Sequence, residues 1–404
     1  MLTPWISTPQ HLSAMQHKID DYRKNYFNLS GGYQLPVIEY VGRFEKIQTE
    51  NDLFDFFISI PIKNQEANII KILESLLSNI HYLHNIGLLF DDCSDNSFQV
   101  CKQFFLKNFS DYPKLLNVYF IKSESDLFES TSENILSLFC EQKYFVSLQS
   151  DIYLIDKTFF SRCIDGFANM PHLMGISGRA TVSFKKSIPI LGYFSYTLRV
   201  FDRNLIFNFF NKYSKKLNTY FPFQKYYGDI SNFPTSIMLF SKSDFYRIFL
   251  GEAIIRGPIV WKFEIFKSLK GYNDISYYLG RDDCDLSFRG LLRGYRVGYL
   301  PTQTFSFYED GTTRKTKTSK VIEMINGREL LAKSNPGELT KFWTEKKRQQ
   351  NKTVVIYFRL IRFLITHGRF VYLNSESTSN NFSKFLRLRT PQKSVSTLSQ
   401  DVTM

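Results

Sequence analysis

The feature that most constrains the fold is a series of apolar segments between residues 56 and 148, each followed by a different pattern. Residues 56–62, Phe-Phe-Ile-Ser-Ile-Pro-Ile, form a continuous apolar run, as in a strand buried on both faces. Residues 66–77 then repeat apolar side chains at helical spacing. Further strands are predicted at 87–90, 118–121 and 145–148, with helices at 97–107 and 132–140. Strands that alternate with helices predict a parallel, doubly wound sheet.

Polar loops with acidic residues follow three of these strands, at 61–66, 91–96 and 149–151. Ligands bind beyond the carboxyl ends of such strands, so we expect the three loops to meet at one edge of the sheet. Asp91 and Asp92 place two adjacent carboxylates at a strand end, which is more than a turn needs. This favours a ligand site over a turn or helix cap. For Asp151, a turn residue and a ligand-binding residue are equal alternatives.

A second acidic cluster, Arg281-Asp282-Asp283-Cys284-Asp285, comes directly before an apolar stripe at helical spacing: Phe288, Leu291, Leu292 and Tyr295. The carboxylates would then lie at a helix N-terminus, where the helix dipole favours their ionised form. They would act as bases or metal partners rather than as acids. The alternative is that Asp283 or Asp285 is only an N-cap. Gly294 is placed to end the helix in a left-handed conformation, before a short strand at 296–300.

Composition sets the broad class of the protein. A chain of 404 residues with 43% hydrophobic residues should form a large core in two or three domains at most. Five scattered cysteines lack metal-ligand or redox spacing, so we expect free thiols in a reducing compartment. The first ten residues do not resemble a signal peptide, and no run of 18 apolar residues occurs. We therefore expect a cytoplasmic protein.

The net charge of +13 is concentrated at the C-terminal end, where residues 312–404 hold 18 Lys and Arg against 6 Asp and Glu. A helical stretch is predicted at 327–350, with an interruption near Pro336. Residues 354–373 place apolar and basic side chains on different helical faces. This basic segment, within 353–373, would either contact an anionic membrane or pack on the main domain with a solvated basic face. No nucleic-acid-binding motif accompanies the charge, so nucleic acid is not expected as a partner.

Taken together, four segments resemble the successive motifs of family 2 glycosyltransferases. They are Ser59-Ile60-Pro61-Ile62-Lys63-Asn64-Gln65-Glu66, Leu89-Phe90-Asp91-Asp92-Cys93-Ser94-Asp95, Leu148-Gln149-Ser150-Asp151-Ile152, and Arg281-Asp282-Asp283-Cys284-Asp285-Leu286 with Arg289 and Gly294-Tyr295. The resemblance covers roughly residues 53 to 310 in the family's order. Leu269-Lys270-Gly271-Tyr272-Asn273 resembles the glycine-aromatic turn before the family's catalytic helix. The resemblance implies a GT-A fold, which is a Rossmann-like, doubly wound mixed sheet with helices on both faces. It also implies a nucleotide-diphosphate sugar as donor and an inverting transfer.

The resemblance also implies roles for individual residues. The nucleotide's base and ribose would be held by Pro61, Lys63, Glu66, Asp91 and Asp92. Lys63 stands where the family often has an aromatic residue, and it could instead meet a phosphate. Ser150 and Asp151 would bind the diphosphate, with Asp151 as the metal residue. Asp283 would be the general base that takes a proton from the acceptor hydroxyl, with Asp282 beside it.

Two departures from the family pattern concern the divalent cation, Mg or Mn, which hard carboxylate oxygens suit. Gln149 replaces the first acid of the metal motif, and the histidine expected near Phe307 or Tyr308 is missing. Glu309 or Asp310 are candidate substitutes. Metal binding is therefore a weaker expectation here than in the family.

The prediction is a GT-A domain at 53–311, with an N-terminal extension at 1–52, a mainly helical basic extension at 312–373 and a polar tail at 374–404. Its expected activity is transfer of a sugar from a UDP- or GDP-linked donor to a glycan or lipid-linked acceptor at the cytoplasmic membrane face, in surface polysaccharide or glycoconjugate synthesis. The alternative is a non-catalytic nucleotide-sugar or glycan-binding module. A nucleotidyltransferase is disfavoured because residues 61–66 supply no Gly-rich basic phosphate loop.

Overall fold

The structure is a computed structural model that describes residues 5–46, 55–154, 156–178, 248–251, 254, 257–300, 304–306, 319–341 and 344. The predictions that concern Phe307 to Asp310 and the segment 353–373 fall outside these residues. All five cysteines are free thiols, as predicted. Within the described part of the chain, no helix is long and apolar enough to cross a membrane.

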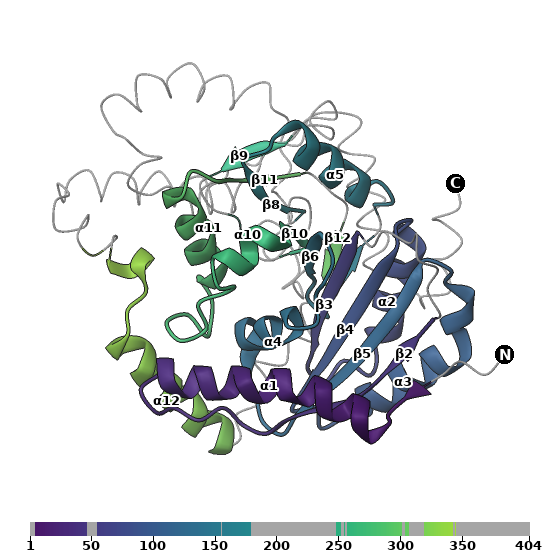
Figure 1. Cartoon of the computed structure of the whole chain (residues 1–404), viewed down its shortest axis with the longest axis horizontal. Helices are drawn as coiled ribbons and strands as arrows, with labels where there is room; N and C mark the ends of the chain where they lie inside the picture. Colours follow the sequence, from purple (N-terminus) through teal and green to yellow (C-terminus); the bar gives the residue numbers. More distant parts are fainter. Residues whose placement is uncertain are drawn as a thin grey trace, which may run out of the picture.

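A ten-stranded mixed sheet forms the centre of the molecule, in the order β1-β2-β5-β4-β3-β6-β10-β8-β11-β9 (Figure 1). Its middle is the predicted parallel block of β5 (Leu115–Ser123), β4 (His84–Asp91), β3 (Phe56–Ile62) and β6 (Tyr144–Ser147). The other strands are β1 (Trp5–Ile6), β2 (Ile38–Glu45), β8 (Leu173–Ser177), β9 (Phe249–Gly251), β10 (Ile259–Lys262) and β11 (Arg296–Tyr299). β2 and β10 flank the parallel block in antiparallel orientation, which makes the sheet mixed. A second sheet pairs β7 (Ile152–Leu154) with β12 (Thr304–Ser306).

Helices cover both faces of the sheet, and each face has its own hydrophobic core. One core holds apolar residues of α2 (Ile69–Asn79), α3 (Ser97–Asn108) and α5 (Phe159–Asn169). The other holds residues of α1 (Pro9–Leu29), α4 (Phe128–Ser137), α10 (Phe263–Ser268) and α11 (Asp282–Leu292). A short 3-10 helix, η1 (Phe109–Asp111), follows α3. β3 serves both faces, because Ile58 and Ile60 join the first core and Phe57 joins the second.

The strand order reverses between β3 and β6. Chain order runs β3, β4, β5 to one side of β3, whereas β6 pairs with its other side. Connections on opposite sides leave a crevice at the carboxyl ends of the two strands, and ligands of doubly wound proteins bind there. The loops that begin at Lys63 and Leu148 flank this point.

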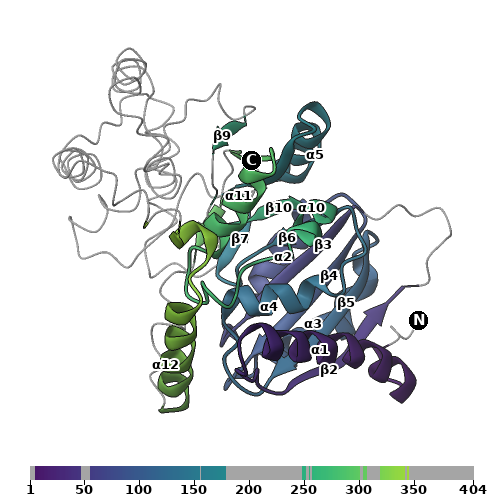
Figure 2. The same cartoon turned by 60° about the vertical axis from the view of Figure 1, so that its left-hand side comes forward.

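The C-terminal helix α12 (Ser319–Ser334) packs near the end of α1 (Figure 2). One of its contacts is the fully buried Arg328, whose guanidinium lies over the rings of Tyr26, Tyr33 and Phe128. The helix ends before Pro336, close to the predicted interruption, and residues 338–341 are helical again. The first part of the basic extension is thereby fixed to the main domain.

Candidate functional site

The loops after β3 and β4 bind each other through side-chain and backbone groups. Oδ1 of Asn64 accepts a hydrogen bond from the backbone N–H of Ser94 at 2.8 Å. The carboxylate of Glu66 accepts one from the backbone N–H of Asn96 at 3.0 Å and another from its side-chain amide at 3.2 Å. Of the predicted nucleotide ligands, Glu66 is therefore engaged in joining the two loops, and Pro61 is a half-buried residue of β3 itself.

Lys63 lies among carboxylates that come from two other strand ends. Its Nζ is 2.9 Å from Oδ2 of Asp126 and 3.3 Å from Oδ2 of Asp92. Burial by itself would lower the pKa of Lys63, but the charges of Asp126, Asp91 and Asp92 outweigh burial and raise it. A protonated ammonium group is thus fixed at the sheet edge where the loops meet.

Asp91 is buried at the end of β4, with Oδ1 accepting a hydrogen bond from the backbone N–H of Leu127 at 2.7 Å. Burial raises the pKa of Asp91 well above its usual value, and the hydrogen-bonded carboxyl of Asp126 raises it further. Asp92 adopts a left-handed backbone conformation with φ of 48°, and its side chain is 41% exposed beside Lys63.

The loop after β6 carries the predicted diphosphate residues. The backbone N–H of Leu148 donates to the carbonyl of Ser59 in β3 at 3.0 Å, which continues the pairing of the two strands. Gln149, Ser150 and Asp151 then form a half-buried turn, closed by a hydrogen bond from the N–H of Ile152 to the carbonyl of Gln149 at 3.0 Å. The turn follows β6 directly, on the other side of the switch point from Lys63.

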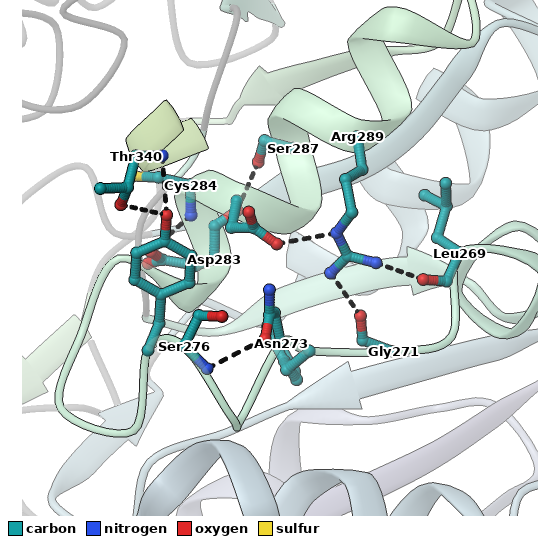
Figure 3. A network of polar contacts seen from close by, with 12 residues as sticks. Leu269, Gly271, Asn273, Ser276, Asp283, Cys284, Ser287, Arg289 and Thr340 are labelled. Atoms are coloured by element: carbon teal, nitrogen blue, oxygen red, sulfur yellow. Dashed lines mark hydrogen bonds and ion pairs between the residues drawn. The ribbon is translucent and has the colours of Figure 1, made fainter. Parts of the chain in front are cut away.

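The acidic cluster begins α11 as predicted, but its carboxylates are not N-caps (Figure 3). The N-cap is Arg281, in a left-handed conformation with φ of 70° and without a capping side-chain bond. Oδ2 of Asp282 accepts a hydrogen bond from Oγ of Ser130 at 2.5 Å. Oδ1 of Asp283 accepts one from the N–H of Cys284 at 2.7 Å. Both side chains are at least 96% buried, so the helix start presents closely held carboxyl groups.

The pKa of Asp285 is shifted in the direction opposite to the one that the helix dipole alone would give. Its Oδ2 pairs with Nε of Arg289 at 2.7 Å, one helical turn along α11. Burial nevertheless raises the pKa of Asp285, and the neighbouring Arg289 offsets only part of that effect. At this residue burial therefore acts against the effect that is expected of the helix dipole. Gly294, with φ of 85°, adopts the predicted left-handed conformation after the helix.

Helix α4 brings the two halves of the candidate site together. At its start, the N–H of Leu127 binds Asp91 of the strand edge. One turn later, Ser130 binds Asp282 of α11. Asp91 at the end of β4 and Asp282 at the start of α11 therefore bind to positions of α4 that are separated by one helical turn, about 5.4 Å long. Sequence reasoning missed Asp126 and the two residues that make this link, Leu127 and Ser130. The one visible signal for Asp126 and Leu127 was that a polar loop follows β5 as it follows β3 and β4.

The residues that the structure describes do not form a complete metal site by themselves. No group of three or more His, Cys, Asp or Glu among them could hold a metal ion. Asp151 supplies a carboxylate, while Gln149 and Ser150 beside it supply only neutral oxygens. A divalent cation would need ligands from elsewhere, for which the oxygens of a diphosphate are chemically suited.

Comparison with known proteins gives structural likenesses only. No protein-family model and no curated protein sequence matches the chain. A structure of S. aureus TarS 1–349 is similar with a TM-score of 0.40 and 13% identity, over 81% of this chain and 78% of that one. Another S. aureus TarS structure gives a TM-score of 0.39 and 12% identity, over 64% of this chain and 38% of that one. The chain thus matches little more than a third of that protein's length. The structure of the mannosyltransferase PcManGT from Pyrobaculum calidifontis, in complex with GDP-Man and Mn2+, is similar with a TM-score of 0.40 and 10% identity. The match covers 72% of this chain and 64% of that one.

Proposed function

We propose that this protein is a glycosyltransferase that moves a sugar from a nucleotide-diphosphate sugar to a hydroxyl group of a glycan or lipid-linked acceptor. The observation that carries the proposal is the double contact of α4, which binds Asp91 through the N–H of Leu127 and Asp282 through Ser130. Such a transfer needs a polar site for the donor and a carboxylate base for the acceptor within one small region. The two ends of this helical turn supply both.

The donor would bind across the switch point between β3 and β6. Carboxyl groups of Asp91 and Asp92 can accept hydrogen bonds from the base and the ribose, with Pro61 and Glu66 shaping the loop around them. The ammonium group of Lys63, held by Asp126 at 2.9 Å, can turn toward a phosphate of the donor. Ser150 and Asp151 would meet the diphosphate from the β6 side. UDP- and GDP-linked sugars are the two donor classes that we propose.

The acceptor would be activated by Asp283, with Asp282 beside it. Asp283 would take the proton of the acceptor hydroxyl while that oxygen forms a bond to the anomeric carbon and the nucleoside diphosphate leaves. Attack from the face opposite the leaving group inverts the configuration of the sugar. Ser130 fixes Asp282 at 2.5 Å, so the pair has little freedom to turn away.

A divalent cation, Mg or Mn, belongs to the proposal as a ligand of Asp151 and the donor's diphosphate. Its chemistry would be to neutralise charge on the leaving group. The described residues supply too few ligands to hold it without the donor. We therefore expect cation binding and nucleotide binding to depend on each other.

The C-terminal part would place the enzyme near its acceptor. We propose that residues 353–373 contact an anionic membrane at its cytoplasmic face, which would bring lipid-linked acceptors close to the domain at 53–311. The docked helix α12 supports this arrangement, because it fixes the start of the basic extension to the main domain through Arg328.

The second candidate is a non-catalytic module that binds a nucleotide sugar or a glycan. The substitution of an acid by Gln149 favours it, together with the lack of a three-ligand group in the described residues. Donor turnover separates the two candidates, since a binding module would retain the sugar on its nucleotide.

Calorimetric titration with UDP and with GDP, each with and without Mn, tests the donor site in the parent protein and in Asp151→Ala. Micromolar binding that needs both the cation and Asp151 is the expected result. Equal binding with and without Mn would remove the cation from the proposal. An absence of binding by either nucleotide would contradict the donor site itself.

A further inference from the structure

Tyr272 is buried between the two halves of the candidate site, with 1% of its surface exposed. Its phenol oxygen lies 2.8 Å from Oγ of Ser147 and accepts a hydrogen bond from Nε1 of Trp261 at 2.9 Å. Because the indole can only donate, the phenol proton remains available to Ser147. Ser147 is the last residue of β6, and the turn at 149–151 begins two residues later. The phenol group therefore contacts the end of β6, directly before the turn at 149–151.

The main chain of Tyr272 is tied to α4 in the opposite direction. The side-chain amide of Asn134 accepts from its N–H at 2.9 Å and donates to its carbonyl at 2.8 Å. Ser130, which binds Asp282, lies one helical turn before Asn134 on the same face of α4. A rigid helix thus connects Tyr272 to the first carboxylate of α11.

A second connection runs through the turn before Tyr272. Arg289 of α11 binds the carbonyl of Gly271 at 2.7 Å, the carbonyl of Leu269, and the carboxylate of Asp285 (Figure 3). Gly271 has φ of 65°, and a Cβ there would lie 2.5 Å from Oδ1 of Asn134. The close approach of this turn to α4 therefore requires glycine.

We propose that Tyr272 is a positioning residue that fixes the loop after β6 relative to the acidic start of α11. The role in catalysis rests on the proposed function, whereas the mechanical link between the two segments does not. Transfer requires the acceptor oxygen and the anomeric carbon to meet within a few tenths of an ångström of the productive geometry. A looser link should therefore slow the chemical step more than it weakens the binding of either substrate.

Tyr272→Phe removes the phenol oxygen and keeps the ring. We expect kcat to fall about 10- to 100-fold, with the KM values for donor and acceptor within about threefold of the parent. Tyr40→Phe is the matched control, because Tyr40 is 2% exposed and its phenol oxygen lies 3.2 Å from Nε2 of His11. Its kcat should equal that of the parent. A kcat of Tyr272→Phe within twofold of the parent would overturn the proposal.

Ser147→Ala provides a milder variant if Tyr272→Phe folds poorly. It removes only the hydroxyl group of β6 that contacts Tyr272, and should also lower kcat without changing the KM for donor or acceptor. The double variant should be no slower than Tyr272→Phe by itself, because both changes break the same link. Additive losses would show that the two residues act separately and would contradict the proposal.

Amide hydrogen exchange tests the link without any activity. In Tyr272→Phe or Ser147→Ala, exchange should become faster at 148–152 and at 281–285 together, and in Tyr40→Phe at neither. Faster exchange in only one segment, or in neither, would overturn the proposal whether or not the parent transfers sugar. If the variants show the coupled exchange but the parent transfers no sugar, the proposed function alone would be contradicted.

Discussion

Oγ of Ser130 donates a hydrogen bond to Oδ2 of Asp282 at 2.5 Å, although 152 positions of sequence separate the two residues. The bond joins the first turn of α4 to the first residue of α11, and both side chains are 1% exposed. A buried carboxylate that accepts a hydrogen bond is held in its orientation. Under the proposed function, Ser130 would therefore influence how the neighbouring Asp283 faces the acceptor.

Ser130→Ala should consequently lower kcat about tenfold, equivalent to roughly 1.4 kcal/mol, and leave the donor KM within about twofold. Steady-state kinetics with saturating acceptor measures the change. Ser137→Ala, on the same helix with its Oγ bonded to a backbone carbonyl at 2.7 Å, should behave as the parent. Equal losses in the two variants would mean that the helix, and not the bond to Asp282, is being disturbed.

How far the sequence predicts this structure depends on the kind of element. β3, β4 and α3 were predicted within a few residues because long apolar runs and turn residues mark them locally. β10 was not predicted, since its four residues carry no distinctive period and its place between β6 and β8 depends on pairing partners far away in sequence. β2 was not predicted either, although its residues alternate between a buried and a more exposed face; its place in the sheet is set by its pairing with β5.

The candidate site shows the same division. Asp91, Asp151 and Asp283 were singled out because acids after strands, or at a helix start, form local patterns. The partners that hold them could not be found in this way: Leu127 binds Asp91 through its backbone, and Ser130 is an ordinary helical serine in sequence. Burial also reversed the expected pKa direction for Asp285, and burial is a property of the packed fold alone.

Lys63→Met should weaken binding of UDP or GDP about tenfold, equivalent to roughly 1.4 kcal/mol, since it removes the ammonium group that we place near the diphosphate. It should also destabilise the fold by roughly 3 kcal/mol, because Asp126 loses its ion pair at 2.9 Å while its side chain stays 3% exposed. Calorimetry and urea unfolding measure the two effects. Lys63→Arg keeps the charge and should therefore retain most of the nucleotide affinity and most of the stability. A Lys63→Met protein as stable as the parent would refute the buried ion pair.

His84 should make the fold sensitive to mild acid. Its side chain is buried at the start of β4, and burial lowers its pKa from 6.5 to about 4. Because the folded protein binds this proton less readily than the unfolded chain, the stabilisation is complete above pH 6.5 and is lost as the pH falls toward 4.

His84→Asn keeps a donor toward the carbonyl of Tyr82 and removes the titrating group. Between pH 7 and 4.5, its free energy of unfolding should therefore fall by roughly 2.5 kcal/mol less than that of the parent. Urea unfolding at the two pH values measures this difference. His17→Asn changes an exposed histidine, so its free energy of unfolding should fall between the two pH values as much as that of the parent. If the free energy of unfolding of His84→Asn falls between pH 7 and 4.5 as much as that of the parent, His84 is not buried in its neutral form.

The most direct test of the central claim is the release of nucleoside diphosphate from UDP- and GDP-linked sugars by the parent and by Asp283→Asn. The parent should release UDP or GDP, and Asp283→Asn should do so at least about 100-fold more slowly while binding the same nucleotide equally well. A parent that binds a nucleotide sugar without ever cleaving it, or an Asp283→Asn protein as fast as the parent, would contradict the assignment of a transferase with Asp283 as its base.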